Sequence, residues 1–261
     1  MSYNVDLPFL PERTKKPRKD GLTMVMDKGI PLRQAEDFVS MNADMVDFVK
    51  LGFGTSVISK DLKAKIKLYQ SNNIKVYLGG TLFEAFVIRD KFKDYVKFIT
   101  ELGLDSAEVS DGSINITHEQ KCEYINKLSK NFTVLSEVGS KEEGVIIHPA
   151  RWIKMMQAEL DAGSIKVIAE ARESGNVGIF HKNGSAHTLL INRIVNKIKG
   201  ENIIWETPQK DQQVYFLKLF GANVNVGNIA VDDVIPLETL RLGLRGDTFF
   251  TFLPENLKQT T

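Results

Sequence analysis

The feature that most constrains the fold is a regular alternation of short β-branched runs with longer helical patterns. From Leu22 onward, eight runs rich in Val, Ile and aromatic residues are each followed by a stretch with apolar residues at helical spacing. Such alternation predicts parallel strands joined by crossover helices, and eight is the number of strands that closes a (β/α)8 barrel. The predicted strands are 22–26, 45–49, 74–78, 106–109, 133–137, 166–170, 202–205 and 223–226.

The chain length agrees with one barrel domain. A barrel takes about 250 residues, and this chain has 261. Because no Pro/Gly/Ser-rich linker divides the sequence, we expect an α/β fold, a single-domain TIM barrel over 21–248, with an irregular basic arm over 1–20 and a tail over 249–261. The alternative is an open doubly wound sheet. That fold usually carries a glycine signature after its first strand, where this chain has "DKG".

Composition and charge argue against several classes of protein. The formal net charge is +1, which gives no reason to expect a nucleic-acid or membrane partner. The lone cysteine, Cys122, excludes an internal disulfide and a Cys-rich metal site. The N-terminal residues lack the apolar core of a signal peptide, and no apolar run approaches the roughly 18 residues of a membrane span. We therefore expect a cytoplasmic protein.

The N-terminal arm holds the main local excess of charge. We interpret it as a solvated, irregular segment, with the alternative that some of its cations reach an anionic ligand at the mouth of the barrel. The basic residues are Arg13, Lys15, Lys16, Arg18 and Lys19.

The carboxyl ends of the predicted strands carry a polar series that the amino ends lack. Catalytic residues of barrel enzymes come from these carboxyl ends. Four glutamates that converge there would repel one another unless cations offset them, although a structural layer of paired charges would look the same. The glutamates are Glu108, Glu137, Glu170 and Glu206. The candidate counter-charges are a divalent cation and the side chains of Lys28, Lys50, Lys141 and Arg172.

Two further patterns concern a metal and a phosphate. Carboxylates without a histidine cluster suit Mg²⁺ better than zinc, and we interpret His118, His148, His181 and His187 as surface residues. The run "NVGN" at 225–228 follows the eighth predicted strand, where barrels often bind phosphate through backbone N–H groups; a plain turn is the alternative. The residues alone thus predict a small anionic, phosphorylated substrate and Mg²⁺, and they leave the reaction open.

Nine motifs in order resemble those of the phosphosulfolactate synthase family, over about 13–248. They are "GLTMVMDKG", "VKLGFGTS", "GGTLFE", "EVSDGS", "SEVGSK", "EARESG", "PQKDQQ", "NVGNI" and "LETLRLGLRGDT". The resemblance implies a (β/α)8 barrel and a lyase that forms a carbon–sulfur bond. Members add sulfite to phosphoenolpyruvate with Mg²⁺ and give (2R)-phospho-3-sulfolactate, which in methanogens leads to coenzyme M. The arm "PERTKKPR" looks more like bacterial and plant relatives.

The resemblance also implies roles for the strand-end residues. Sulfite attack on C3 of phosphoenolpyruvate creates an enolate-like charge, and an acid then protonates C2. Lys141 is expected to be that acid, with Glu137 and Arg172 as the other catalytic residues. Mg²⁺ is expected on Glu108, Glu137 and Glu170. The expected substrate-binding residues are Lys28, Lys50, Arg172, Ser174, Asn225, Gly227 and Asn228.

Two other functions remain possible at this point. One is a barrel enzyme with the same enolate and Mg²⁺ chemistry on a different nucleophile or substrate. The other is a non-catalytic, stress-associated relative that binds a partner, against which the intact charged set speaks. A homo-oligomer is expected from the aromatic tail "DTFFTFLPENL", with the alternative that this tail closes the bottom or side of the same barrel. Glu173 and Glu206 receive no role.

Overall fold

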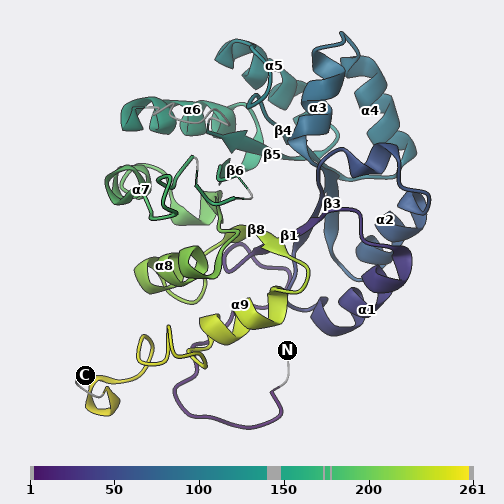
Figure 1. Ribbon diagram of the computed structural model, residues 1–261. Coiled ribbons are helices and arrows are strands. Elements are labelled where there is room, and N and C mark those ends of the chain that lie inside the picture. The colour runs from purple at the N-terminus through teal and green to yellow at the C-terminus, as the bar shows by residue number, and fades with distance from the viewer. Residues whose placement is uncertain (1–2, 140–147, 173, 177, 259–261) are drawn as a thin grey trace.

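The structure, a computed structural model, describes residues 3–139, 148–172, 174–176 and 178–258, and it has the predicted barrel architecture. All strand pairs are parallel, and the helices lie outside the ring of strands (Figure 1). The strands are β1 Thr23–Asp27, β2 Phe48–Leu51, β3 Lys75–Leu78, β4 Ser106–Val109, β5 Thr133–Val138, β6 Ser164–Ala169, β7 Ile203–Glu206 and β8 Val226–Ala230.

The α-helices are α1 Leu32–Asn42, α2 Leu62–Ser71, α3 Gly80–Val87, α4 Phe92–Glu101, α5 His118–Ser129, α6 Pro149–Asp161, α7 Thr188–Val195, α8 Lys210–Phe220 and α9 Val234–Arg241. Short 3-10 turns are η1 Thr55–Val57, η2 Gly200–Asn202 and η3 Glu255–Leu257. Thr117 and Gln120 form a capping box at the start of α5. Among the described residues, no helix is both long and apolar enough to cross a membrane.

The ladder of strands is nearly closed. Its order is β3-β2-β1-β8-β7-β6-β5-β4, so β3 and β4 are the end strands, and they lie beside each other without a ladder of their own. A side chain bridges this gap, because the backbone N–H of Gly80, at the start of α3, donates to Glu108 Oε1 on β4 at 2.6 Å.

The interior of the barrel changes from apolar to polar along the strands. A cluster with one side chain from each of six strands fills the lower part: Met24, Phe48, Tyr77, Leu135, Ile168 and Ile204, with Leu22 beside them. Side chains two positions apart point to the same face of a strand. On four strands the position two residues after the apolar one is charged, and the pairs are Phe48 and Lys50, Leu135 and Glu137, Ile168 and Glu170, and Ile204 and Glu206. This step produces the polar series at the carboxyl ends.

Two predicted strands differ clearly from the structure, and one helix was not predicted. The second strand begins at Phe48 rather than at 45, α3 was not predicted, and the eighth strand is Val226–Ala230 rather than 223–226. The eighth strand begins later because the residues before it serve the floor of the barrel. Asn225 Nδ2 donates to Ile203 O at 3.0 Å, and Asn225 Oδ1 accepts from Leu22 N at 3.0 Å.

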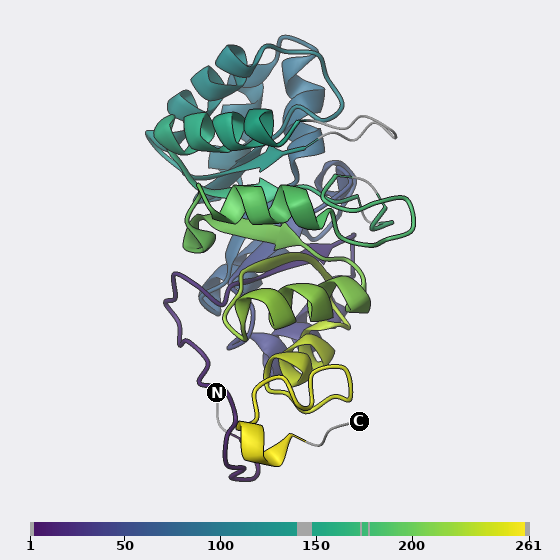
Figure 2. The ribbon, with the colours of Figure 1, turned by 90° about the vertical axis from the view of Figure 1, so that its left-hand side faces the viewer.

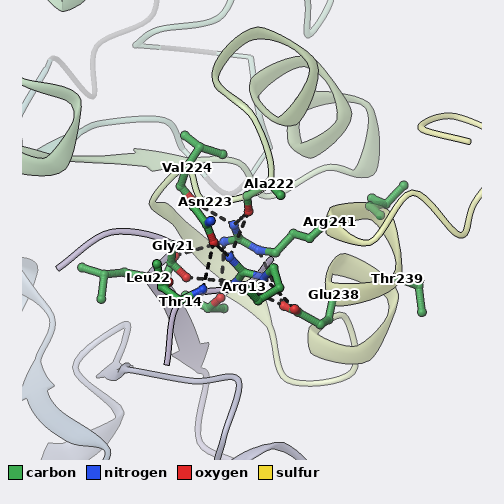
Figure 3. Close-up of polar contacts among 12 residues, drawn as sticks. Arg13, Thr14, Gly21, Leu22, Ala222, Asn223, Val224, Glu238, Thr239 and Arg241 are labelled. Atoms are coloured by element: carbon green, nitrogen blue, oxygen red, sulfur yellow. Dashed lines mark hydrogen bonds and ion pairs between the residues drawn. The ribbon is translucent and has the colours of Figure 1, made fainter. Parts of the chain in front are cut away.

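The basic arm binds the floor of the barrel, which corrects the expectation that it is solvated. Arg13 is buried; its Nε donates to Glu238 Oε1 at 2.7 Å and its Nη1 to Ala222 O at 3.0 Å (Figure 3). Arg18 Nε lies 2.9 Å from Asp47 Oδ1. Figure 2 shows the arm on the left and the loop between β6 and α7 on the right, at opposite ends of the strands. The arm is therefore irregular, as expected, but it does not reach the mouth.

Candidate active site

A cavity of about 340 Å³ opens at the carboxyl ends of the strands. Its size suits a small metabolite, and most of its polar lining comes from the predicted series. The lining residues are Met26, Lys50, Phe53, Gly79, Thr81, Glu137, Glu170, Ala171, Arg172, Ser174, Glu206 and Asn228.

Lys50 is the centre of the charged cluster below this cavity. Its Nζ lies 2.9 Å from Glu108 Oε1, 3.1 Å from Glu137 Oε2 and 3.7 Å from Glu206 Oε1. Burial alone would lower the pKa of Lys50, but the three carboxylates together outweigh burial and raise that pKa well above its usual value. Lys50 therefore keeps its proton and acts as a fixed positive charge.

The carboxylates around Lys50 carry more negative charge than its ammonium neutralises. Burial raises the pKa of Glu108, and the charge of Glu137 adds to this effect against the attraction of Lys50. Burial raises the pKa of Glu206 to about 8; Lys50 opposes this shift, whereas the charges of Glu137 and Glu108 add to it. Glu108 Oε2 is buried and has no hydrogen-bond partner among the described residues. The cluster therefore favours an additional cation, either a proton or a metal ion.

Glu170 lies beside the same cavity. Its carboxylate packs against the backbone of Gly139, where a Cβ would come within 2.8 Å of Glu170 Oε2. Glu137 and Glu170 both line the cavity. Glu108 does not line the cavity and instead forms an ion pair with Lys50. Within the described residues, no three His, Cys, Asp or Glu side chains are gathered in an arrangement that could hold a metal ion. The three-glutamate magnesium set stays a prediction.

The rim of the cavity is formed by the loop from β6 to α7. Ala171 N donates to Glu206 Oε2 at 2.9 Å, and Asn228 Nδ2 donates to Ala171 O at 3.3 Å. Asn228 has a φ of 58°, a conformation that Asn tolerates better than most residues. These two bonds fix the start of the loop, so that Arg172 and Ser174, both exposed, line the cavity.

Lys28 stands on a second, shorter loop at the rim. Asp27, at the end of β1, holds that loop by accepting from Gly29 N at 2.7 Å, and Lys65 Nζ lies 2.7 Å from its other oxygen. Lys28 is exposed, with its Nζ 5.8 Å from the ring centroid of Phe53 in the cavity lining. The structure thus brings Lys28 to the same mouth.

Sequence reasoning missed Lys121. It lies fully buried behind β5, where its Nζ donates to Asp111 Oδ1 at 2.9 Å and to the main-chain oxygen of Glu137 at 2.5 Å, and lies 2.8 Å from Glu159 Oε1. A lysine in an amphipathic helix normally faces solvent, so the sequence held no signal for this contact.

Some predicted site residues lie elsewhere. Asn225 is on the floor of the barrel, which corrects its assignment to substrate. Gly227 lies inside β8, where a Cβ would come within 2.6 Å of Met24 Cε, so its small size serves packing in the barrel rather than a phosphate loop. Lys141 and Glu173 lie outside the described residues.

The histidines do not enter the cavity lining. His118 is half-buried near Glu159, and exposed His148 caps α6. The rings of His181 and His187 lie 3.5 Å apart between centroids, in the loop from β6 to α7.

Comparison with known structures supports the fold. The YdjI aldolase from Escherichia coli K12 superposes with a TM-score of 0.56 at 7% identity and covers 82% of this chain and 76% of its own. The 3-hexulose-6-phosphate synthase from Salmonella typhimurium has a TM-score of 0.54 at 14% identity and covers 86% of this chain and 100% of its own. At such low identity these matches concern the barrel only.

Comparison of sequences is more specific. The phosphosulfolactate synthase of Methanocaldococcus jannaschii is 44% identical over 237 residues, which is 88% of this chain and 94% of that protein. Those of Methanothermobacter thermautotrophicus and Bacillus subtilis are each 41% identical over 244 residues, covering 91% and 92% of this chain and 95% and 97% of their own. The family model described as (2R)-phospho-3-sulfolactate synthase (ComA) matches residues 11–247. The chain therefore belongs to the phosphosulfolactate synthase family and is an enzyme that catalyses carbon–sulfur bond formation.

Proposed function

We propose that this enzyme adds sulfite to C3 of phosphoenolpyruvate and protonates C2 to give (2R)-phospho-3-sulfolactate, with Mg²⁺ bound at the mouth of the barrel. Family membership supports the reaction type. The observation that carries the proposal is the cluster of carboxylates around Lys50 beneath a rim that bears Arg172 and Ser174. Anions enter at the rim, and a cation site lies below them.

The rim suits the anionic groups of the substrates. The Arg172 guanidinium offers a planar fork to phosphate or sulfite, and the Ser174 hydroxyl offers a further donor. Lys28 adds positive charge from the neighbouring loop. Because phosphoenolpyruvate and sulfite repel each other, gathering them requires such cations at the entrance.

Glu137 and Glu170 are the residues that would hold Mg²⁺. Both are carboxylates that line the cavity, and magnesium commonly uses one or two carboxylates together with substrate oxygens and water. A cation there also relieves the negative excess around Lys50, which would otherwise repel anionic substrates. When bound, Mg²⁺ supplies electrostatic stabilisation of negative charge on the substrate.

The chain's own residues would stabilise the negative charge that develops on the substrate and would supply the proton for C2. As the sulfur lone pair attacks C3, the C2–C3 π electrons move toward C2 and the carboxylate as an enolate-like charge. Lys50 holds its proton and stabilises this charge without reorganising. A separate acid must then transfer one proton to a single face of C2, and Lys141 is our candidate.

The test is consumption of phosphoenolpyruvate by the purified protein, with sulfite and Mg²⁺ supplied or omitted one at a time. We expect loss only when both are present, with a product of phosphosulfolactate mass and R configuration. Loss with another nucleophile in place of sulfite would favour the alternative barrel enzyme. Loss without Mg²⁺, in protein washed with a chelator, would contradict the metal part alone.

Two substitutions test the roles. Lys141→Ala should reduce kcat by about 10²–10⁴-fold, the usual contribution of a general acid, while substrate binding persists. Turnover at the parent rate would exclude Lys141 as the proton donor.

Arg172→Lys should raise the KM for an anionic substrate because the planar fork of the guanidinium is lost. An unchanged KM for both substrates would exclude a bidentate clamp.

A further inference from the structure

The motif "PQKDQQ" at 208–213 has no role in the chemistry above, yet two of its three glutamines, Gln209 and Gln212, contact the loop at the rim. Gln209 precedes α8 and Gln212 lies in the first turn of that helix, where the two form a reciprocal capping box. Gln212 is buried, whereas Gln209 is exposed. A capping box uses only part of each amide group, which leaves one NH₂ group on each glutamine.

Those NH₂ groups bind the backbone of the loop from β6 to α7. Gln209 Nε2 donates to Ser174 O at 2.6 Å. Gln212 Nε2 donates to Gly175 O at 2.7 Å and more weakly to Gly184 O at 3.4 Å. The first turn of α8 is thus tied to both branches of the loop.

The loop has the conformation that this contact requires. Gly175 N donates to Arg172 O at 2.7 Å, and this bond closes a tight turn that contains Ser174. Gly175 has a φ of 66°, and a Cβ on it would lie 2.6 Å from Gln212 Nε2. Only glycine accepts both the left-handed conformation and the close approach of the glutamine.

The turn is therefore held at both ends. Ala171, just before it, is bound by Glu206 and Asn228, and the two glutamines bind its last residues. Arg172 and Ser174, whose side chains line the cavity, lie between these fixed points.

We infer that Gln209 and Gln212 are positioning residues that hold this turn in the conformation in which Arg172 and Ser174 receive the substrate anion. This inference rests on the proposed function for the anion-binding role of the turn. Its physical basis is preorganisation. An exposed arginine on a free loop loses conformational entropy when the anion binds, whereas a loop that the glutamines already hold has lost that entropy during folding.

The kinetic test uses Gln212→Leu, which keeps the volume of the side chain and removes its hydrogen bonds. We expect the KM for the anion that Arg172 binds to rise about tenfold, the effect of roughly one lost hydrogen bond, with a smaller change in kcat. In a double-mutant cycle, Gln212→Leu should have little further effect on an Arg172→Ala background. Equal effects on both backgrounds would overturn the positioning role.

A second measurement does not depend on turnover. Hydrogen exchange at the amides of Gly175 and Gly184, which donate to Arg172 O and His181 O, should become at least about tenfold faster in Gln212→Leu if the clamp is lost. Gln209→Met, at an exposed site, should give a smaller acceleration and serves if the first variant does not fold. Unchanged exchange in a folded variant would overturn the inference.

The matched control is Gln70→Leu. Gln70 Nε2 also donates to a glycine oxygen, Gly103 O at 2.9 Å, but at the floor of the barrel. Gln70→Leu should leave the KM and the hydrogen exchange of Gly175 unchanged. If it changed them as much as Gln212→Leu does, the loss of any glutamine hydrogen bond would disturb the rim, and the positioning role would be wrong. If the parent protein consumes no phosphoenolpyruvate, the proposed function fails, while the exchange data still decide whether the clamp exists.

Discussion

At the scale of single residues, the charge of Lys50 decides how the barrel mouth is built. Three carboxylates lie within 4 Å of its ammonium, and each would be costly to bury alone. The ammonium and the carboxylates are stable inside the protein only together. Functional and structural roles therefore coincide, and a change at Lys50 must affect both.

We predict that Lys50→Met lowers the free energy of unfolding by about 3–5 kcal/mol at pH 8–9. The pKa of Glu206 already lies at about 8 against an ordinary value of 4.5. A carboxyl with a raised pKa stabilises the fold below its unfolded pKa, and this contribution is lost as the pH rises through the folded pKa. The variant should therefore recover stability toward pH 5, as denaturant unfolding across pH 5–9 would measure.

The control for this prediction is Lys166→Met. Lys166 is also buried, but its Nζ donates to the main-chain oxygens of Lys19 and Glu201 at the floor. The change in the free energy of unfolding caused by Lys166→Met should be nearly independent of pH over the same range. If the two variants share one pH profile, the carboxylate cluster is not the cause.

At the scale of elements, the sequence predicts those features that follow from the two-residue repeat of side chains along a strand. The steps from Phe48 to Lys50 and from Ile204 to Glu206 follow the two-residue repeat of a strand, so the converging charges were predictable. Asn225 was assigned to the mouth wrongly, because a polar residue that binds backbone at the floor looks the same in sequence as one that binds a ligand. Lys121 was missed because only tertiary packing buries it.

The start of α3 supports a second prediction. Gly80 N donates to Glu108 Oε1, and a Cβ on Gly80 would lie 2.7 Å from that same oxygen. Gly80→Ala should displace Glu108 from Lys50, lower stability by about 1–3 kcal/mol and reduce kcat. Thermal unfolding and turnover test this. Gly200→Ala, where a Cβ meets nothing within 4 Å, should change neither quantity.

The loop from β6 to α7 supports a prediction about pH. Burial and then the charge of neighbouring His181 lower the pKa of His187. A histidine with a lowered folded pKa binds its proton better when the loop opens, so loop stability falls as the pH drops below about 6.5. Hydrogen exchange of the loop, corrected for intrinsic rates, should show less protection at pH 5.5 than at pH 7.5. His187→Asn should remove this difference; its persistence there would assign the effect to another group.

At the scale of the whole molecule, the two ends of the barrel have separate tasks. The mouth carries the charged cavity, while the floor is closed by the arm, with Arg13 bound to Glu238 and to the backbone before β8 (Figure 3). The arm joins the first residues of the chain to α9, the last helix of the barrel. Arg13 and Arg18 therefore contribute to the closure of the barrel and not to substrate capture.

We predict that Arg13→Leu lowers the free energy of unfolding by about 3–5 kcal/mol, because it leaves the Glu238 carboxylate buried without this partner. The KM for each substrate should stay at the parent value, since the floor lies at the opposite end of the strands from the mouth. Lys15→Leu, at an exposed position of the same arm, should change stability by less than about 0.5 kcal/mol. Denaturant unfolding and steady-state kinetics on the two variants measure both quantities. A raised KM in folded Arg13→Leu would show that the floor is coupled to the mouth through the strands, and the separation of tasks would then be wrong.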